Sequence, residues 1–303
     1  MSKVPILNRI QAGEILISDG ATGTNLLQRG LPRGKTAENW VFEQPEQIIR
    51  LNQDFLNSGA DIILTSTFGA SSIRLRNTSL DGRVIEVNQR AASLAIQATY
   101  DTASYVGGSI GPLGQLLKPL GPITTEEAGI AYAEQAKALS DAGVDLLVIE
   151  TQFDLAEAKT AILAARSVSS LPIVASFSYD RGKKTMMGLS PVKAATELST
   201  LPVDVIGINC GRSLDENIAN LIELKAVTNL PIWFKPNAGL PRLDDDGNPV
   251  YDLTPEQMGI SAAQWISAGA KIIGGCCGTS PAHLFHIAQE VKHLREFPSD
   301  SSL

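Results

Sequence analysis

Three cysteines occur in this chain of 303 residues, and their positions could place three thiolates around one metal ion. Cys210 follows the apolar run at 205–209, and Cys276 and Cys277 follow the apolar pair and two glycines at 272–275. If both runs are strands of one barrel, the cysteines at their ends can meet. Three soft sulfur ligands with one open coordination position are typical of a zinc site that also binds substrate. Zinc in such a site can deprotonate a substrate thiol, which creates a nucleophile at neutral pH.

The spacing of the cysteines leaves other interpretations open. A free cysteine is most often a small buried hydrophobic residue. A disulfide is a second alternative, although adjacent cysteines pair poorly with each other and an odd count leaves one thiol over. His283 could complete a mixed cysteine and histidine site, but it lies in the last helical segment with two further histidines, where such residues are usually at the surface or at the helix end.

Eight short runs rich in β-branched residues recur along the chain, and each is almost entirely apolar. Such runs are typical of strands buried on both faces of a parallel sheet. We expect strands at 15–19, 61–65, 105–109, 145–150, 173–177, 205–209, 232–235 and 271–275. The segments between them have helical periodicity, most clearly at 44–58, 85–98, 125–142, 155–167 and 254–268.

Eight alternations of strand and helix predict an α/β protein with a single (β/α)8 barrel, the TIM-barrel fold. A weak repeat at 58–63, 142–147 and 268–273 supports this fold, because each copy indicates a helix that ends at glycine and a buried strand that follows. A doubly wound open sheet is the alternative, since strand order cannot be derived from the sequence. We expect one barrel domain over 1–296 and a loose polar tail over 297–303.

The composition argues against several classes of function. A net charge of −7 without a basic cluster disfavours nucleic acid as a partner. No apolar stretch approaches 18 residues and the start lacks a leader pattern, so we expect neither a membrane span nor a signal peptide. Three cysteines in a chain of this length suit a reducing cytoplasm better than a disulfide framework.

Polar residues gather at the carboxyl ends of the predicted strands, where TIM barrels carry their active sites. Besides the cysteines, these ends carry Asp19, Thr67, Ser109, Glu150 and Asn209. Asp19 and Glu150 could bind the ammonium group of an amino acid. A buried ion pair, for instance with Lys235, is an equally good interpretation of the two carboxylates.

Two further features at the strand ends could take part in chemistry. The turn formed by Gly20, Ala21, Thr22 and Gly23 has accessible backbone N–H groups that could hold a carboxylate. An ordinary loop that caps the next helix explains this turn equally well. Lys235 could form a Schiff base, which is the chief rival chemistry, although we favour a structural ion pair for it.

Taken together, seven segments resemble the homocysteine S-methyltransferase family, and they are most similar to the homocysteine-binding module of cobalamin-dependent methionine synthase. The resemblance covers about residues 15 to 294. The segments lie at 19–24, 59–75, 108–112, 149–151, 207–210, 236–241 and 274–279. The most specific feature is Gly-Gly-Cys-Cys-Gly-Thr at 274–279 combined with the upstream Asn-Cys pair.

This resemblance implies a (β/α)8 barrel in which Cys210, Cys276 and Cys277 hold Zn²⁺. It implies that the sulfur of homocysteine takes the open zinc position as a thiolate and attacks a methyl group, which gives methionine. Asp19 and Glu150 match family residues that bind the substrate ammonium, and the backbone from Ala21 to Gly23 would receive its carboxylate.

Two departures from the family bear on the methyl donor. Gly69 stands where the betaine-using branch has a tyrosine, which disfavours betaine. The cobalamin-dependent enzymes continue into folate, corrinoid and reactivation domains, so we expect methylcobalamin to arrive on a separate corrinoid protein. A self-sufficient enzyme that uses a sulfonium donor, S-methylmethionine or S-adenosylmethionine, is the alternative. A non-catalytic subunit that binds homocysteine or zinc is a hypothesis of another class.

Overall fold

The computed structural model describes residues 3–244 and 249–297, and these residues form a TIM barrel. Eight parallel strands pair in the order β1, β10, β7, β6, β5, β4, β3, β2. A single parallel bridge between Ser18 and Ile62 joins the first strand to the last and closes the ring. An open doubly wound sheet is therefore the wrong alternative. The strands are β1 (Leu16–Ile17), β2 (Ile62–Leu64), β3 (Tyr105–Ile110), β4 (Leu146–Gln152), β5 (Ile173–Phe177), β6 (Val205–Cys210), β7 (Ile232–Pro236) and β10 (Ala270–Ile273).

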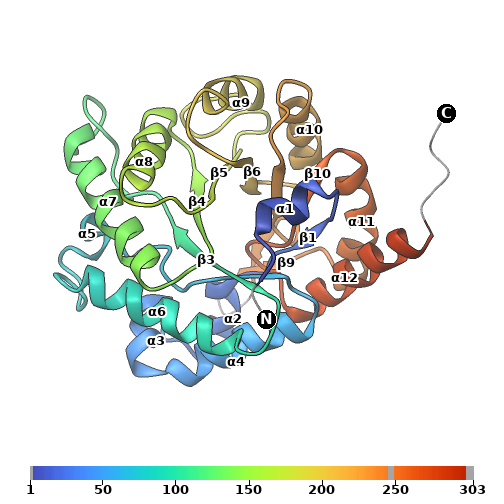
Figure 1. Ribbon diagram of the computed structural model, residues 1–303, viewed down its shortest axis with the longest axis horizontal. Coiled ribbons are helices and arrows are strands. Elements are labelled where there is room, and N and C mark those ends of the chain that lie inside the picture. The colour runs from blue at the N-terminus through green and yellow to red at the C-terminus, as the bar shows by residue number, and fades with distance from the viewer. Residues whose placement is uncertain (1–2, 245–248, 298–303) are drawn as a thin grey trace.

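Helices surround the strands, and Figure 1 shows them as an outer ring. Thr124 and Thr254 begin α7 and α11 with capping boxes, in which a threonine hydroxyl and a side chain three residues later satisfy free backbone groups. The described helices are α1 (Ile6–Gln11), α2 (Thr22–Gln28), α3 (Ala37–Glu43), α4 (Pro45–Asn57), α5 (Ser72–Leu75), α6 (Val84–Ala98), α7 (Thr125–Asp141), α8 (Leu155–Val168), α9 (Pro191–Leu198), α10 (Leu214–Lys225), α11 (Pro255–Ser267) and α12 (Pro281–Glu296). None of them has the length and apolar character that crossing a lipid bilayer requires.

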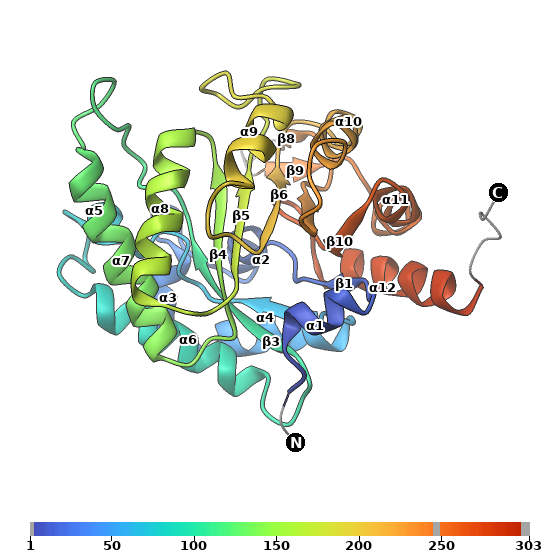
Figure 2. The same ribbon diagram turned by 45° about the horizontal axis from the view of Figure 1, so that its top comes forward.

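The interior of the barrel changes from apolar to polar along each strand. Alternate residues of the strands point inward, and those near the amino ends form one apolar cluster. Ile6 and Ile10 of α1 belong to that cluster, so α1 closes this end of the barrel. Figure 2 shows α1 at the opposite end from the short hairpin of β8 (Pro241–Leu243) and β9 (Pro249–Tyr251). The same alternation carries polar side chains at the carboxyl ends, where the candidate site lies.

A glycine allows the polar layer to sit directly above the apolar one. A Cβ atom at Gly207 of β6 would lie 2.1 Å from the carbonyl oxygen of Trp233 and 2.7 Å from its Cβ. Trp233 is fully buried inside the barrel and fills this space. The absence of a side chain at position 207 thus lets the large indole pack below Asn209 and Lys235.

Three aspartates that precede strands explain part of the sequence repeat. Asp61 precedes β2 and accepts a hydrogen bond from the backbone N–H of Ile17 (2.9 Å). Asp145 and Asp204 do the same for the N–H groups of Val106 and Ile173. Each carboxylate therefore fastens the start of its own strand to the start of the strand before it. Two of the three repeated phrases have one of these aspartates, Asp61 or Asp145, as their fourth residue, and the third has Lys271 there instead.

All eight predicted strands are present, with ends that differ by up to two residues. The expected strand at 271–275 begins at Ala270 and ends at Ile273, because Gly274 and Gly275 turn their N–H groups to the carbonyl oxygens of Phe234 and Asp19. The hairpin of β8 and β9 is not among the strands that we expected from the sequence. Of the predicted tail at 297–303, Phe297 follows the end of α12, and residues 298–303 fall outside the described residues.

Candidate metal and substrate site

The three cysteines come together at the carboxyl ends of neighbouring strands. The Sγ atom of Cys210 lies 3.0 Å from that of Cys276 and 3.8 Å from that of Cys277, and all three sulfurs lie within 4.8 Å of one another. Four sulfurs around a tetrahedral zinc ion, at about 2.3 Å each, are separated by about 3.8 Å. These three residues therefore fit the requirements of one zinc ion, and their partial exposure leaves a side open.

Backbone hydrogen bonds fix the cysteine pair against the end of β7. The N–H of Cys276 donates to the carbonyl oxygen of Pro236 (2.8 Å), and the carbonyl oxygen of Cys277 accepts from Ala238 (2.9 Å). The 3.0 Å separation between Cys210 and Cys276 exceeds a disulfide bond of about 2.05 Å, so all three thiols are free. Hydrogen bonds from Cys210 and Cys276 lower the pKa of Cys277 to about 3.

Two residues at the site have a left-handed backbone conformation, which residues other than glycine rarely adopt. Cys210, the last residue of β6, has a φ of 59°, and so does Thr151, which follows Glu150 in β4. A β-branched residue such as Thr151 is strained in this left-handed region. Because strain of this kind persists only where the surroundings impose it, contacts with neighbouring residues must hold the backbone at both positions. The turn at Cys210 directs the chain into Gly211, which also has a positive φ.

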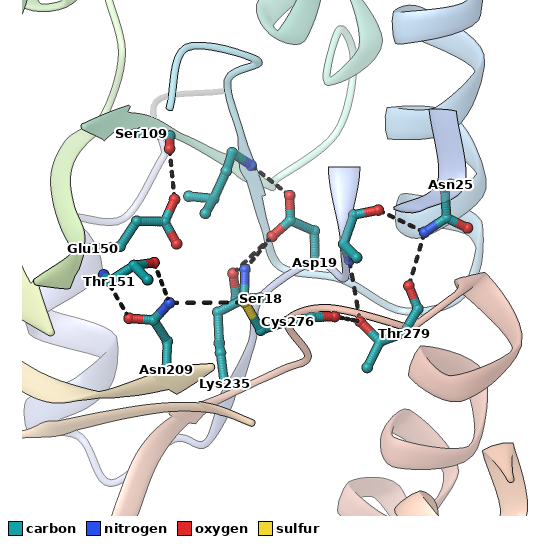
Figure 3. Close-up of polar contacts among 12 residues, drawn as sticks. Ser18, Asp19, Asn25, Ser109, Glu150, Thr151, Asn209, Lys235, Cys276 and Thr279 are labelled. Carbon is teal, nitrogen blue, oxygen red and sulfur yellow. Dashed lines mark hydrogen bonds and ion pairs between the residues drawn. The ribbon is translucent and has the colours of Figure 1, made fainter. Parts of the chain in front are cut away.

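Asn209 holds the strained Thr151 in place. Its Oδ1 accepts hydrogen bonds from the N–H of Thr151 (2.8 Å) and from Ser176 Oγ (2.6 Å). Its Nδ2 donates to Thr151 Oγ1 (2.7 Å) and reaches Cys276 Sγ at 3.8 Å. Figure 3 shows this amide between the end of β4 and the cysteine. Asn209 therefore joins the metal-binding side of the site to the carboxylate side.

The two carboxylates expected at the site have different partners. Asp19 is fully buried, and its Oδ1 lies 2.6 Å from Lys235 Nζ while its Oδ2 accepts from the N–H of Leu64 (2.8 Å). Glu150 accepts a hydrogen bond from Ser109 Oγ (2.5 Å). Burial raises the pKa of Glu150 to about 7, although the charge of Lys235 acts in the opposite direction. Figure 3 shows both carboxylates and the lysine that lies near them.

Lys235 is held as an ammonium ion rather than as a nucleophilic amine. Burial acts against its charge, but Asp19 and Glu150 outweigh this effect and raise the pKa of Lys235 above its usual range. A Schiff base requires the neutral amine to attack a carbonyl group. The geometry therefore favours the structural ion pair over the rival Schiff-base chemistry.

A cavity of about 860 Å³ opens in front of the sulfurs and of Glu150. Nine of the twelve residues that we expected at the site line it: Gly20, Ala21, Thr22, Gly23, Ser109, Glu150, Cys210, Cys276 and Cys277. The other three, Asp19, Thr67 and Asn209, are buried behind its wall. Thr67 Oγ1 donates to the carbonyl oxygen of Ser109 (2.7 Å), which makes it a support for the β3 end of the site.

The cavity continues outward from the sulfurs to α2, α3 and α5. Its outer part is lined by Leu27, Leu31, Glu38, Glu43, Phe68 and Leu80. Glu38 is buried, and its Oε1 accepts a hydrogen bond from the N–H of Gly69 (2.6 Å). The cavity therefore offers room for an amino acid at the sulfurs and for a second group farther out, beside a carboxylate.

Two residues that the sequence did not single out also contact the site. Thr151 lines the cavity in its strained conformation. The ring of Tyr251 of β9 lies against Gly278, the residue after Cys277, where an added Cβ would come within 2.3 Å of the ring. Burial raises the pKa of Tyr251, and the negative charge of Cys277 raises it further, so its hydroxyl stays protonated. A tyrosine in a segment without a strand pattern gave no signal of this role.

A family model and the similar curated proteins both relate this sequence to homocysteine methyl transfer. The homocysteine S-methyltransferase family matches residues 16–291. Methionine synthase of Mycobacterium tuberculosis is 31% identical over 300 residues, which are 93% of this chain and 25% of that protein. The methionine synthase of Mycobacterium leprae is 29% identical over 96% of this chain and 26% of its own length. The chain thus spans about a quarter of the length of these relatives.

Solved structures similar to this one include a relative of nearly the same extent. The metallated form of the homocysteine methyltransferase MmuM from Escherichia coli is 26% identical and has a TM-score of 0.79, and the match covers 94% of this chain and 99% of that one. The apo form of the same protein gives a TM-score of 0.74 at 26% identity.

Proposed function

The chain belongs to the homocysteine S-methyltransferase family, and we propose on this basis that it transfers a methyl group to the sulfur of homocysteine, with zinc held by Cys210, Cys276 and Cys277. The product is methionine. The observation that carries the proposal is the spacing of three free sulfurs for one tetrahedral ion, at the wall of a cavity that also contains a buried carboxyl group. A reaction that needs three free thiols suits the reducing cytoplasm, where we place it.

The donor set of the cluster supports zinc rather than a harder metal. Thiolate ligands select soft or borderline ions, and a three-cysteine arrangement that leaves one tetrahedral position open matches zinc. When bound, zinc would lower the pKa of the substrate thiol, so that the sulfur reacts as a thiolate at neutral pH.

The remaining groups of the site would bind the amino-acid part of homocysteine. Glu150 lines the cavity and is the carboxylate that we assign to the substrate ammonium. Asp19 is already paired with Lys235, so we assign it a second role behind Glu150. The first-turn N–H groups of α2, at Thr22 and Gly23, have no partner within the helix and would bind the substrate carboxylate.

For the methyl donor we propose methylcobalamin that a separate corrinoid protein presents at the open cavity. The likeness to mycobacterial methionine synthases supports this donor. A small sulfonium compound is the second candidate, because a specific observation favours it. The cavity contains the Glu38 carboxyl group and the Phe68 ring, which would attract a small cation, beside Arg74, whose charge would act against it.

The test is methionine formation by reduced, zinc-loaded protein with homocysteine and one donor at a time. We expect turnover with methylcobalamin, one zinc per chain, and loss of both zinc and turnover in Cys210→Ser and Cys276→Ser. Turnover with S-methylmethionine or S-adenosylmethionine alone would replace the corrinoid by the second candidate. Full activity and zinc content in the cysteine variants would contradict the metal site. Binding of homocysteine without turnover under every donor would favour the non-catalytic subunit.

A further inference from the structure

Cys210 is the one proposed zinc ligand that β6 supplies, because Cys276 and Cys277 are adjacent residues after β10. The direction of the Cys210 side chain therefore decides whether the three sulfurs meet. The backbone of Cys210 has a φ of 59°, and the next residue, Gly211, has a φ of 80°. A cysteine in this left-handed region is strained, so the turn at 210–211 needs contacts that hold it.

Side chains from three parts of the barrel bond the polar backbone groups of this turn. The carbonyl oxygen of Cys210 accepts a hydrogen bond from Nδ2 of Asn217 (2.6 Å), a residue of α10. The N–H of Gly211 donates to Ser178 Oγ (3.1 Å), just after β5, and the carbonyl oxygen of Gly211 accepts from Asn237 Nδ2 (2.8 Å), just after β7. The shortest of the three bonds is the one to the ligand residue itself, so Asn217 has the most direct hold on Cys210.

The local structure builds Asn217 into this position. It lies in the first turn of α10, and the side chains of a helix point toward its amino end, which here begins shortly after Cys210. The amide of Asn217 fills the space that Gly211 leaves, because a Cβ atom at position 211 would lie 2.3 Å from Asn217 Oδ1 and 2.6 Å from its Nδ2. Only 1% of Asn217 is exposed, so bulk water cannot replace it as the donor to Cys210.

We infer that Asn217 is a positioning residue of the metal site, which locks the main chain of Cys210 in its left-handed turn and so places the Cys210 sulfur beside Cys276 and Cys277 before a metal binds. The inference rests on the proposed zinc site. Asn217 does not line the cavity and acts only through Cys210. A ligand that is already in place binds a metal more tightly, because binding does not have to fix its conformation.

The same helix offers a matched control one turn later. Asn220 is also fully buried, and its Nδ2 also donates one hydrogen bond to a carbonyl oxygen outside the helix, that of Gly182 (2.9 Å). In both asparagines, Oδ1 has no hydrogen-bond partner among the described residues. Gly182 lies in the loop after β5, which carries none of the proposed ligands. A change at Asn220 therefore removes an equivalent bond of α10 and leaves the turn at 210–211 in place.

The test compares Asn217→Leu and Asn220→Leu with the parent protein. Each variant loses the amide donor at nearly constant side-chain size. Competition with a chromogenic chelator measures the zinc affinity of the reduced proteins, and the ligand-field bands of the cobalt(II)-substituted proteins report the geometry of the metal. Thermal denaturation of the metal-free proteins measures their stability. If Asn217→Leu does not fold, the smaller pair Asn217→Ala and Asn220→Ala takes its place in the same measurements.

We expect Asn217→Leu to bind zinc about 10- to 100-fold more weakly than the parent, and Asn220→Leu to stay within about twofold of it. The cobalt bands should change in Asn217→Leu only. Both variants should lower the melting temperature of the metal-free protein by a similar amount, since each leaves a carbonyl oxygen without its bond. Parent-like zinc affinity in Asn217→Leu would overturn the inference. Equal weakening in both variants would also overturn it, since that would indicate a general loss of stability.

The outcomes separate this inference from the proposed function. A parent protein that binds zinc but transfers no methyl group to homocysteine would overturn the proposed function, and the zinc affinities of the variants would still decide the role of Asn217. A parent protein that binds no metal would overturn both.

Discussion

At the scale of single residues, the charge of Glu150 controls substrate binding in the proposed function. Burial raises the pKa of Glu150 to about 7, so below pH 7 most of the free protein carries a neutral carboxyl group there. An ammonium group binds the ionised form. The affinity should therefore rise as the pH increases from 6 to 7 and level off above about 7.5.

This pH dependence can be measured by calorimetric titration of the protein with methionine, which has no thiol to titrate and keeps its ammonium charge over this range. Glu150→Gln should weaken binding by about 10- to 100-fold and remove the pH dependence. Glu157→Gln is the matched control, since Glu157 is also a buried carboxyl group, bonded to Leu113 and Tyr132 away from the cavity. A flat profile in the parent would contradict the assignment of the ammonium to Glu150.

The sequence located the chemistry-bearing residues but not their accessibility. Residues at strand ends can be predicted because the apolar runs end there, and this places Glu150 and the cysteines together. Whether a side chain faces the cavity depends on its partners. Asp19 is turned away by Lys235, and Thr67 is buried against Ser109. The strained backbone of Thr151 had no sequence signal at all, since glycine is the residue expected at such an angle.

At the scale of elements, the aspartates that precede strands tie neighbouring strands together. Asp145 Oδ2 accepts a hydrogen bond from the N–H of Val106 (2.7 Å) and also pairs with Lys3, which is partly exposed. Removing this acceptor leaves a backbone N–H without its bond, whereas the exposed ion pair contributes little. Asp145→Ala should lower the free energy of unfolding by about 1–3 kcal/mol, and Asp145→Asn by about 1 kcal/mol or less.

Urea denaturation measures this difference, with the slope of the transition as a check on the denatured state. Asp141→Ala serves as the control, because Asp141 forms an exposed ion pair with Lys137 one helical turn away, worth about 0.5 kcal/mol at most. If Asp145→Asn lowered the free energy of unfolding as much as Asp145→Ala, the stabilising contact would be the ion pair with Lys3. The hydrogen bond from the N–H of Val106 would then contribute little.

The elements that the sequence predicted well are those with long apolar patterns. The strand at 173–177 and the helices at 125–142 and 155–167 agree with β5, α7 and α8 to within one residue. The sequence did not predict the hairpin of β8 and β9, because each of its strands is only three residues long. The residues of β8 are all exposed, so no alternation of apolar and polar residues marks this strand.

At the scale of the whole molecule, the barrel closes at a short seam between β1 and β2. β1 contains only two residues, and one isolated bridge joins Ser18 to Ile62 of β2. Asp19 strengthens this seam, because its carboxylate accepts the N–H of Leu64 and pairs with Lys235 of β7. The alternation of strands and helices predicted the barrel, but this connection between three strands joins residues that are up to 216 positions apart and follows no sequence pattern.

The buried ion pair of Asp19 and Lys235 leads to a prediction about stability. Removing one of the two charges should destabilise the protein more than removing both. Asp19→Asn keeps an acceptor for the N–H of Leu64 but leaves the Lys235 ammonium without its 2.6 Å partner, and should lower the free energy of unfolding by about 3 kcal/mol. Adding Lys235→Met removes the stranded charge and should restore most of this loss, because an apolar side chain of similar length can pack above Trp233.

Denaturation of the two single variants, the double variant and the parent gives the coupling between the two positions. Asp54→Asn is the control, since the Asp54–Arg29 pair is partly exposed. Its loss should lower the free energy of unfolding by less than about 1 kcal/mol. Additive losses in the double variant would mean that the seam depends on each side chain separately. Restored stability in the double variant would place the Asp19–Lys235 pair in the closure of the barrel.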